Sequence, residues 1–535
     1  MNVAEYIVKV LQSNEIDTVF GYQGGNITYL IDAISREEGM RYVQTYHEQG
    51  AAFAANAYAQ VSHKFGVALS SSGPGAINMV NGIANAYYDS IPCLFITGNI
   101  NTASMRESDK IRQNGFQEAD IVGMVKGITK YAETVCQPER FPQILEQALY
   151  LMQEGRPGPV LLDIPHNIQR TELKEPIQWE RIIEKEPPAT EAAAVELIFK
   201  KMKRARRPAL LLGNGSRGET EKKLIEKFLS RFPMPAVASL CGKDAISNQH
   251  PCYRGMIGSY ALSYANRILN EADFVLALGT RMDERQRTVA ANDFLKEADV
   301  IHVDIDKNEL GHVKKDEFCM NLSVEQFLTD FLGNISDGTK ELHQTWLKQT
   351  EQWMREPVAE EEWIYGSLLK QKLTEIFGET VSDSVVCVDV GNHQMAVAQC
   401  LNVGEGSRYL NSAGLGSMGY ALPAAIGAYY AAPEKRIIAI AGDGGIMMNL
   451  QELQLVKREK LPITVAVVNN QGLGMIEDYQ KLAMGGRVYG SRWGYEAADF
   501  SKIAKAFDLN YCKCSDKKDK LSLANSKQIL IEIEV

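Results

Sequence analysis

The stretch Arg436-Ile-Ile-Ala-Ile-Ala-Gly-Asp-Gly444 is an apolar run that ends in two glycines around one aspartate. A second apolar run, Ile463–Val468, ends in Asn469-Asn470. Short runs of this kind are typical of buried parallel strands, whose carboxyl ends meet at one edge of a sheet. Mg²⁺ takes carboxylate, carboxamide and main-chain oxygens together with phosphate and water. The sequence therefore predicts a magnesium site with Asp443, Asn470 and the carbonyl of Gly472 as ligands.

The glycines beside this aspartate, Gly442, Gly444 and Gly445, let the main chain approach a diphosphate closely. The segment Ile446–Lys457 is predicted to be a helix whose N-terminal dipole favours phosphate. Taken alone, Gly-Asp-Gly is also ordinary turn chemistry after a buried strand. The second strand with its Asn-Asn pair favours the metal-site interpretation.

Length and charge limit the class of protein. At 535 residues the chain is too long for one core, and usual domain sizes predict about three domains. A formal net charge of −10 argues against nucleic acid or an anionic membrane as a main partner. No apolar stretch approaches the ~18–20 residues of a membrane-spanning helix, and the start has no basic and apolar leader. We therefore expect a cytoplasmic protein with neither nucleic acid nor membrane as partner.

Short apolar runs alternate with helical patterns along most of the chain, which predicts an α/β fold built from parallel βαβ units. A polar, proline-containing stretch, Arg170–Ala193, reads as a linker. A second polar segment lies around Gly333–Glu360. We expect three consecutive doubly wound parallel-sheet domains, over residues 1–170, 190–335 and 361–535. In such sheets ligands bind beyond the carboxyl ends of the strands.

The Gly-Asp-Gly and Asn-Asn pair, separated by a helix and a strand, resembles the signature of thiamine diphosphate enzymes. The resemblance implies thiamine diphosphate and Mg²⁺ as cofactors, with a pyrimidine-binding first domain and a diphosphate-binding third domain. Glu48 matches the glutamate that contacts the pyrimidine ring, where a carboxyl controls the proton on a ring nitrogen. Without a cofactor site, it would simply be a carboxylate at a helix N-terminus.

Three further segments, Asp89–Gly98, Gly115–Gly123 and Gly155–Pro165, resemble acetohydroxyacid synthase, the branch of that family that makes acetolactate. In that enzyme a Phe-Gln pair faces the reaction site. The turn-forming stretches around Gly24 and Gly73 accompany these segments. The resemblance implies catalytic roles for Glu48, Gly25, Phe116, Gln117, Arg285 and Met418, and cofactor contacts in the first domain from Gly24, Gly73 and Asn78.

In the third domain, Val388–Met395 resembles the loop of the synthase that contacts the diphosphate. Ser412–Gly419 carries the methionine that bends the two rings of the cofactor together, although a methionine among glycines is otherwise ordinary core filling. The implied cofactor contacts in this domain are Gly391, Asn392, His393, Gln394, Gly416, Met418, Gly442, Asp443, Gly444, Gly445, Asn470, Gly472, Leu473, Gly474 and Met475.

The middle domain carries a weak dinucleotide pattern, Gly213-Asn-Gly-Ser-Arg-Gly218, and no acidic residue follows its next strand, so a nicotinamide cofactor is not expected. Other segments are similar to the FAD-binding segments of the synthase, which implies FAD contacts from Arg156, Gly213, Gly215, Met256, Gly279, Arg281, Asp283, Arg285, Asp304 and Asp306. The alternative is a domain that keeps the fold and has lost the flavin.

Arg285 is either a surface ion pair or, by the resemblance, the group that binds the carboxylate of a second keto acid through two hydrogen bonds. Four positions depart from the synthase where it lines its substrate channel: Asn26, Asn101, His166 and Tyr479. The sequence also stops after the strand Ile529–Val535, without the tail that closes over that channel. An unusual or larger acceptor would fit these departures.

The resemblance implies decarboxylation of pyruvate and transfer of the two-carbon unit to a second 2-keto acid. Three alternatives stay open: transfer to a keto sugar or other bulky carbonyl, simple 2-keto acid decarboxylation, and a catalytically idle paralogue. Because the family shares each active site between two chains, a homodimer or homotetramer is expected, and a regulatory subunit is a candidate partner.

Overall fold

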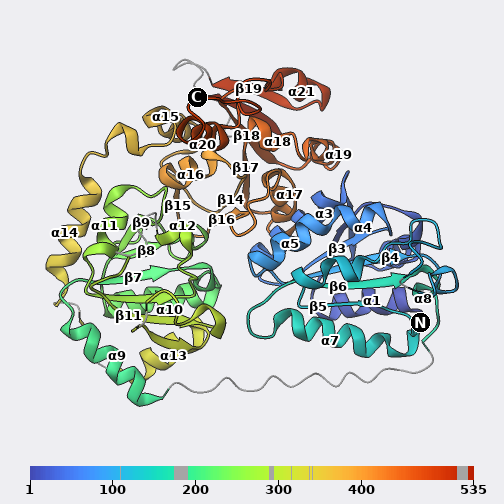
Figure 1. Cartoon of the computed structure of the whole chain (residues 1–535), viewed down its shortest axis with the longest axis horizontal. Helices are drawn as coiled ribbons and strands as arrows, with labels where there is room; N and C mark the ends of the chain where they lie inside the picture. The colour runs from blue at the N-terminus through green and yellow to red at the C-terminus, as the bar shows by residue number, and fades with distance from the viewer. Residues whose placement is uncertain are drawn as a thin grey trace. The chain divides into compact units, whose positions relative to one another are not determined.

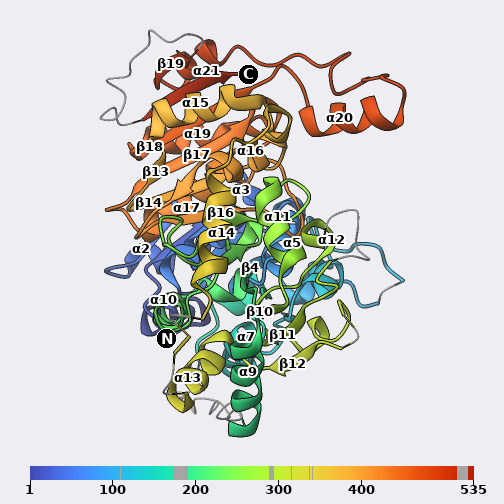
Figure 2. The ribbon, with the colours of Figure 1, turned by 90° about the vertical axis from the view of Figure 1, so that its left-hand side faces the viewer.

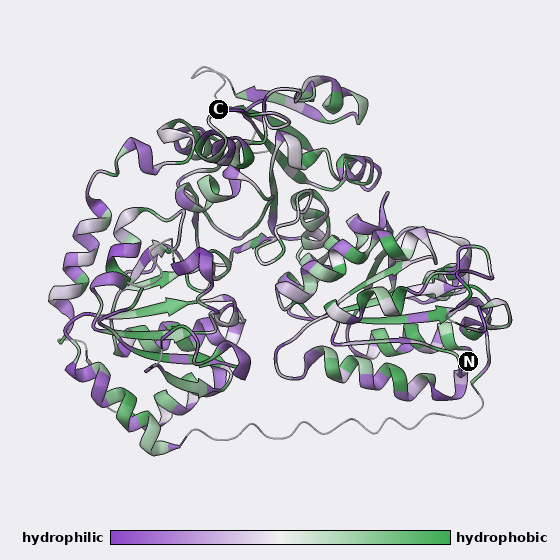
Figure 3. Cartoon of the chain, in the orientation of Figure 1, coloured by the Kyte–Doolittle hydropathy of each residue, from purple (hydrophilic) through white to green (hydrophobic). Residues whose placement is uncertain are grey.

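The structure is a computed structural model that describes residues 1–108, 110–173, 191–287, 294–314, 316–335, 338–339, 342–514 and 528–535. Three six-stranded sheets follow one another along the described parts of the chain, and the strand pairs described in them are parallel (Figure 1). The predicted class, three parallel-sheet α/β domains, is confirmed. Apolar residues are concentrated in the strands and on the helix faces that cover them (Figure 3).

The first sheet has the strand order β2-β1-β3-β4-β6-β5. Its strands are β1 Thr18–Gly21, β2 Arg41–Gln44, β3 Gly66–Ser70, β4 Cys93–Asn99, β5 Tyr131–Thr134 and β6 Val160–Pro165. Its helices are α1 Val3–Ser13, α2 Thr28–Arg36, α3 Glu48–Ser62, α4 Pro74–Asn78, α5 Val80–Tyr88, α6 Ile121–Val125, α7 Phe141–Gln153 and α8 His166–Gln169.

The middle sheet has the order β12-β11-β10-β7-β8-β9. Its strands are β7 Pro208–Leu212, β8 Ala236–Ala238, β9 Tyr253–Met256, β10 Phe274–Leu278, β11 Asp299–Asp304 and β12 Phe318–Asn321. Helices α9 Ala192–Arg204, α10 Glu219–Arg231 and α13 Val324–Asn334 share one core on one face, and α11 Ser263–Glu271 and α14 Gln344–Arg355 share another on the other face (Figure 1). The short helix α12 Glu284–Arg287 follows β10, and α15 Gly366–Phe377 precedes the small pair β13 Thr380–Val381 and β15 Asn402–Val403.

The third sheet has the order β16-β14-β17-β18-β20-β19. Its strands are β14 Ser384–Val388, β16 Arg408–Asn411, β17 Arg436–Gly442, β18 Ile463–Asn469, β19 Asn510–Cys514 and β20 Ile529–Glu534. The helices here are α16 Asn392–Cys400, α17 Ala421–Ala431, α18 Asp443–Ile446, α19 Leu453–Arg458, α20 Gly474–Ala483 and α21 Phe500–Ala506. Helix α20 projects from this sheet, and its Tyr479 is 61% exposed (Figure 2).

The described residues group into two compact units. The first unit contains the first sheet together with Val385–Gly391 and Leu410–Glu534, which hold most of the third sheet. The second unit contains the middle sheet together with Asn392–Tyr409. The first and third sheets therefore belong to one compact unit, although the middle domain separates them in the sequence.

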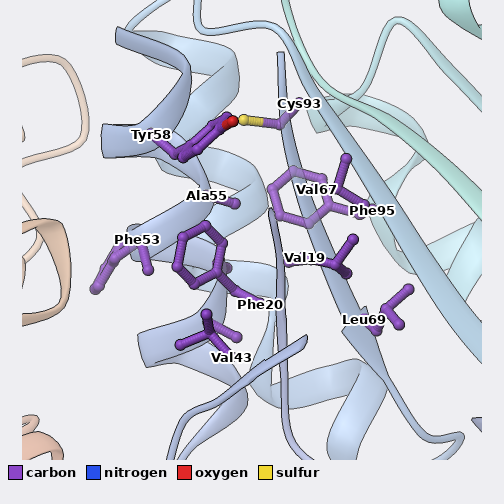
Figure 4. Packing of buried hydrophobic residues seen from close by; sticks show 14 of the residues in the cluster. Val19, Phe20, Val43, Phe53, Ala55, Tyr58, Val67, Leu69, Cys93 and Phe95 are labelled. Atoms are coloured by element: carbon purple, nitrogen blue, oxygen red, sulfur yellow. The ribbon is translucent and has the colours of Figure 1, made fainter. Parts of the chain in front are cut away.

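Helix α3 joins the first and third sheets because small residues allow close helix packing. Its Tyr58 lies on the side of the strand residues Phe20 and Cys93, whereas its Phe53 points away from that sheet (Figure 4). The ring of Phe53 meets Tyr420, at the start of α17, with 5.4 Å between ring centroids. A Cβ on Gly427 of α17 would lie 2.0 Å from the carbonyl oxygen of Ala54, so glycine is required there.

The predicted helix over Ile446–Lys457 is wrong as a continuous element. The chain forms α18, then a turn and the 3₁₀ helix Leu450–Glu452, and then α19. The break follows Ile446, and beyond it the side chain of Asn449 donates a hydrogen bond of 2.8 Å to the carbonyl of Gly419 in another segment. A four-residue α18 has little helix dipole, so the dipole argument for phosphate binding does not hold.

No helix within the described ranges has both the length and the apolar character needed to cross a bilayer.

Candidate active site

Asp443 bridges the ends of two neighbouring strands of the third sheet. Strands β17 and β18 pair in parallel with Gly442 opposite Val468, which brings the loops that follow them together. The Asp443 carboxylate accepts hydrogen bonds of 3.1 Å from the backbone N–H of Gly444 and of 3.1 Å from that of Gly472. Asp443 and Gly472, two of the predicted metal ligands, are therefore neighbours, as the sequence predicted.

The two asparagines that follow β18 have different surroundings. The carboxamide of Asn469 is buried, donates to the Glu532 carboxylate of the adjacent strand at 2.7 Å, and accepts from the backbone N–H of Gln471 at 3.0 Å. The carbonyl oxygen of Asn470 accepts from the Arg492 guanidinium at 2.9 Å. Asn469 thus fixes the loop in place, and Asn470 is the member of the pair that the sequence predicts as a metal ligand.

These residues fit a magnesium–phosphate site. Among the described residues no group of three His, Cys, Asp or Glu side chains could hold a metal, so Asp443 would be a sole carboxylate ligand. Mg²⁺ tolerates this where phosphate and water supply the other oxygens. Burial raises the pKa of Asp443 to about 6. A bound cation would lower that pKa again, because it stabilises the ionised carboxylate.

Three predicted cofactor residues converge above this site. A Cβ on Gly444 would lie 2.6 Å from the Cδ2 atom of Leu473 and 3.7 Å from the Cε atom of Met418. The same position would be 3.2 Å from the hydroxyl of Tyr495. The glycine at position 444 therefore keeps the space between Met418 and Leu473 open, as a cofactor that contacts all three residues would need.

Asp389 positions the Met418 loop, and the sequence analysis assigned it no role. Both carboxylate oxygens accept from the backbone N–H of Gly419, at 2.9 and 3.0 Å, and one also accepts from that of Val390. Burial raises the pKa of Asp389 to about 7. A Cβ on Gly445 would lie 2.9 Å from this carboxylate. An aspartate directly after the apolar run Val385–Val388 was the signal available in the sequence.

Glu48 is the first residue of α3, and its carboxyl group is buried. Its Oε2 atom accepts a hydrogen bond of 3.0 Å from the carboxamide of Asn78. Its Oε1 atom lies 3.0 Å from where a Cβ on Gly75 would be. The predicted residues Glu48 and Asn78 are therefore in direct contact, and Gly75 leaves room beside the second oxygen.

The other predicted residues of the first domain lie in turns that follow its strands. A Cβ on Gly24 would lie 2.4 Å from the side chain of Ser71, so the chain approaches closely there, whereas a Cβ on Gly25 would meet open space. Gly73 adopts a φ of +58° and lies against the carbonyl of Gln117, which itself has a φ of +64°. The structure thus joins Gly73 and Gln117, while the neighbouring Phe116 is 85% exposed.

Helix α5 connects the Glu48 region to the Met418 loop. This helix presents two polar side chains to the segment 412–417, and a third follows directly after the helix. Asn81 accepts from the Ser417 hydroxyl at 2.8 Å, and Asn85 accepts from that of Ser412 at 2.5 Å. Just beyond α5, Asp89 accepts from the backbone N–H of Gly414 at 2.7 Å. Asn78 bonds Glu48 and Asn81 bonds the residue before Met418, so two contacts link the Glu48 segment and the Met418 segment within the first compact unit.

The residues predicted to contact diphosphate, Gly391 to Gln394, are split between the two compact units. Gly391 has a φ of +145° and ends a segment of the first unit. Asn392, His393 and Gln394 begin α16 in the second unit and are buried. Neither carboxamide atom of Gln394 has a hydrogen-bond partner among the described residues. A buried amide with this capacity suits a ligand with acceptor and donor groups.

Most residues predicted to contact flavin lie at the carboxyl edge of the middle sheet. Gly213 and Gly215, after β7, touch the loop after β10, because a Cβ on Gly213 would lie 2.1 Å from the carbonyl of Gly279. Arg281 pairs with Asp283 at 3.3 Å, and Asp304 accepts from the backbone N–H of Asp306 at 2.9 Å. Met256 ends β9 and is buried. Arg156 belongs instead to the first compact unit, where its Nε donates to the Ser90 hydroxyl at 2.8 Å.

Within the part of the chain that the structure describes, Arg285 is exposed and forms no ion pair. Its guanidinium lies 5.7 Å from the centre of the Tyr260 ring and 3.8 Å from the sulfur of Met395. A cation over an aromatic ring with unfilled donors remains able to bind a carboxylate. The nearby Arg254, from a segment that resembles a flavin site, is instead buried and donates to carbonyl oxygens such as that of Pro251 at 2.8 Å.

Comparison with known proteins agrees with this geometry. The N-terminal TPP binding domain of thiamine pyrophosphate enzymes matches residues 1–124, the central domain matches 195–331, and the C-terminal TPP binding domain matches 389–529. These matches define the class as a three-domain thiamine pyrophosphate enzyme, and the chain carries its TPP binding domains.

Several curated relatives match almost the whole chain. The acetolactate synthase isozyme 2 large subunit of Escherichia coli (strain K12) is 35% identical, over 95% of this chain and 90% of that protein. The acetolactate synthase large subunits of Cyanidium caldarium and of Lactococcus lactis subsp. lactis (strain IL1403) are each 33% identical, over 96% and 99% of this chain and 88% and 91% of those proteins. The chain therefore belongs to the acetolactate synthase large-subunit family, which confirms the resemblance found in the sequence.

Proposed function

We propose that the chain decarboxylates pyruvate and transfers the two-carbon unit to the carbonyl of a second 2-keto acid, forming acetolactate or a related acetohydroxyacid. The observation that carries the proposal is that Glu48, Met418 and Asp443 belong to one compact unit of a chain whose relatives are named acetolactate synthase large subunits. Pyruvate and the second keto acid are the proposed substrates, with thiamine diphosphate and Mg²⁺ as cofactors.

When bound, thiamine diphosphate supplies the carbanion and the electron sink that decarboxylation of a 2-keto acid requires. The chain's own residues would hold and protonate it. Asp443, the side chain of Asn470 and the carbonyl of Gly472 would hold Mg²⁺ against the diphosphate. Met418, fixed by the contact of Asp389 with Gly419, would support the two rings in a bent arrangement.

Glu48 would exchange a proton with a nitrogen of the pyrimidine ring. Because its Oε2 already accepts from Asn78, Oε1 is the oxygen left to carry that proton, and Gly75 leaves it room. Burial of the carboxyl group excludes water from this exchange. Arg285 would bind the carboxylate of the second keto acid through two of its donors.

The experiment is product analysis after incubation of the purified protein with thiamine diphosphate, Mg²⁺ and pyruvate alone. We expect release of CO2 together with acetolactate. Release of aldehyde without acetolactate would identify a simple decarboxylase instead. Failure to bind thiamine diphosphate in calorimetry would identify a catalytically idle paralogue.

A second candidate function is transfer of the same two-carbon unit to a bulky carbonyl such as a keto sugar. Four positions that differ from the synthase favour it, and the structure places one of them, Tyr479, on the exposed side of α20. Another, Asn26, donates to the Ser72 hydroxyl at 2.6 Å in the turn beside Gly25. CO2 release from pyruvate only when a second carbonyl compound is added would support this function.

FAD in the middle domain, a homodimer or homotetramer, and a regulatory subunit belong to the same proposal. The glycine contacts at the ends of β7 and β10 and the acidic end of β11 support a nucleotide site there. The relatives are named large subunits, which supports a smaller partner chain. A visible absorption spectrum of the purified protein tests the flavin, and light scattering tests the oligomer.

A further inference from the structure

Glu452 is a buried carboxyl group with no part in the chemistry described above. It is the last residue of the 3₁₀ helix Leu450–Glu452 in the third-sheet region, and its side chain is fully covered. Its Oε1 accepts from the backbone N–H of Tyr46 at 2.9 Å, and its Oε2 lies 3.2 Å from the same nitrogen. The backbone N–H of His47 is a second donor to this carboxyl.

These two amides belong to Tyr46 and His47, the residues immediately before Glu48. Helix α3 begins at Glu48, and His47 is its N-cap, with an Nδ1 atom that accepts from the backbone N–H of Gln49. The direction in which the Glu48 side chain leaves the helix depends on the backbone of residues 46 to 48. A carboxyl from the third-sheet region therefore fixes the start of the helix that carries the proposed proton-transfer residue.

Residues of both segments, around α3 and around Glu452, are suited to this contact. Gly50, in the first turn of α3, would place a Cβ only 2.6 Å from the Oε1 of Glu452, so any other residue would push the carboxyl away. Arg458 is the charged group that acts on Glu452 besides these amides, and its guanidinium donates to the carbonyl of Gln44 at 2.8 Å. The carboxyl and the helix start fit each other closely.

We propose that Glu452 is a positioning residue that holds the start of α3 so that Glu48 reaches the pyrimidine ring of the cofactor. The inference rests on the proposed function. Its action depends on an acceptor oxygen at the right distance from the main chain and not on a negative charge, because both of its hydrogen-bond partners are backbone N–H donors. Burial raises the pKa of Glu452 to about 8, so the group keeps an accepting oxygen while largely protonated at neutral pH.

Two substitutions separate the effect of side-chain length from the effect of the carboxyl charge. Glu452→Gln keeps an oxygen at the same reach and removes the titrating group, whereas Glu452→Asp keeps the carboxyl and shortens the side chain by one methylene. Gln451→Ala, at the neighbouring half-buried position, is the control for damage to the 3₁₀ helix.

The first measurement is amide hydrogen exchange at Tyr46 and His47 in the cofactor-free protein. We expect protection in the wild-type protein, Glu452→Gln and Gln451→Ala, and faster exchange in Glu452→Asp. The second measurement, with thiamine diphosphate and Mg²⁺ bound, is the rate at which the C2 proton of the cofactor exchanges with deuterium. We expect this rate and kcat to fall on the order of 100-fold in Glu452→Asp, as a misplacement of about 1 Å can cause. The KM for thiamine diphosphate should change little.

Glu452→Asp with wild-type amide protection and C2 exchange would overturn the inference. Equal loss in Glu452→Gln and Glu452→Asp would also overturn it, because charge and not reach would then matter. A wild-type protein that fails to exchange the C2 proton would contradict the proposed function instead. The amide exchange of the four proteins would in that case still report on the contact itself.

Discussion

One group of buried acids in the first compact unit is held differently from a buried acid of the second. In the first, Asp389, Asp443 and Glu452 face backbone N–H groups, and burial raises their pKa values to about 7, 6 and 8. In the second, burial acts in the same direction on Asp244, but Arg217 and Arg408 hold its pKa well below the usual range. Oxygen Oδ2 of Asp244 accepts from Arg217 at 3.0 Å and lies 3.3 Å from the Nε of Arg408.

The difference separates structural from functional carboxyl groups. A buried carboxylate with two arginine partners has its charge compensated by the fold, and removing it would strand two cations. A buried carboxylate that accepts hydrogen bonds only from uncharged donors keeps its capacity for a proton or a metal ion. The Glu48 carboxyl is likewise buried beside a neutral donor, the carboxamide of Asn78.

The largest expected effect is that of Glu48→Gln on catalysis. The substitution keeps the size of the side chain and its contact with Asn78 but removes the proton that Glu48 exchanges. We expect kcat to fall by about 10²–10⁴-fold, the usual contribution of general acid–base catalysis. Steady-state kinetics with pyruvate measures the loss. Unchanged circular dichroism and retained thiamine diphosphate binding are the controls, and a variant with wild-type kcat would remove Glu48 from the mechanism.

Asp244→Asn should lower the free energy of unfolding and leave the rate of catalysis less affected. Arg217 and Arg408 are both buried and would lose their counter-charge. Breaking such a group typically costs about 3–5 kcal/mol of unfolding free energy. Denaturant unfolding, followed through the transition of the middle domain, would measure this loss of unfolding free energy. A loss below about 1 kcal/mol would show that this buried cluster is not the structural counterpart of the acids in the first unit.

A smaller effect is expected in the pH dependence of stability. The folded-state pKa of Glu452 is about 8, above the ordinary glutamate value, so between pH ~4.5 and ~8 the folded chain binds a proton that the unfolded chain has lost. Its contribution to stability therefore decreases as the pH rises through this window. Relative to the wild-type protein, Glu452→Gln should gain about 3–4 kcal/mol between pH 5 and pH 8.

Thermal or denaturant unfolding of the cofactor-free wild type and Glu452→Gln at several pH values tests this. A constant difference between the two proteins across the window would show that Glu452 titrates normally. It would place this carboxyl with ordinary solvated acids and weaken the comparison between the two units.

The sequence predicted the strands and their ends well because apolar runs bounded by glycine are strong signals. The strand expected over Ile463–Val468 became Ile463–Asn469, and the aspartate after β17 lies where a parallel sheet must place it. The helix expected over Ile446–Lys457 failed, because Asn449 makes a tertiary contact with Gly419 that no local pattern reveals.

The sequence likewise predicted some residues of the candidate site and missed others. Glu48, Asp443 and Met418 belong to segments with recognisable local patterns, and the structure brings them into one unit. Asp389 and Glu452 act on segments far away in the sequence, Glu452 on an amide 406 residues earlier. Such contacts depend on how the first and third sheets pack, so a single sequence gives only the weak signal of an acid within an apolar run.

The central claim, that the acid beyond β17 anchors the cofactor, is tested most directly by calorimetric titration of thiamine diphosphate in the presence of Mg²⁺. The variant is Asp443→Asn, and Asp163→Asn is its matched control, since burial also raises the pKa of Asp163 to about 6 but its carboxylate accepts from Thr97 and Asn99. The account predicts wild-type affinity for Asp163→Asn and affinity at least about 100-fold weaker for Asp443→Asn. Wild-type affinity in Asp443→Asn, or equal losses in both variants, would contradict it.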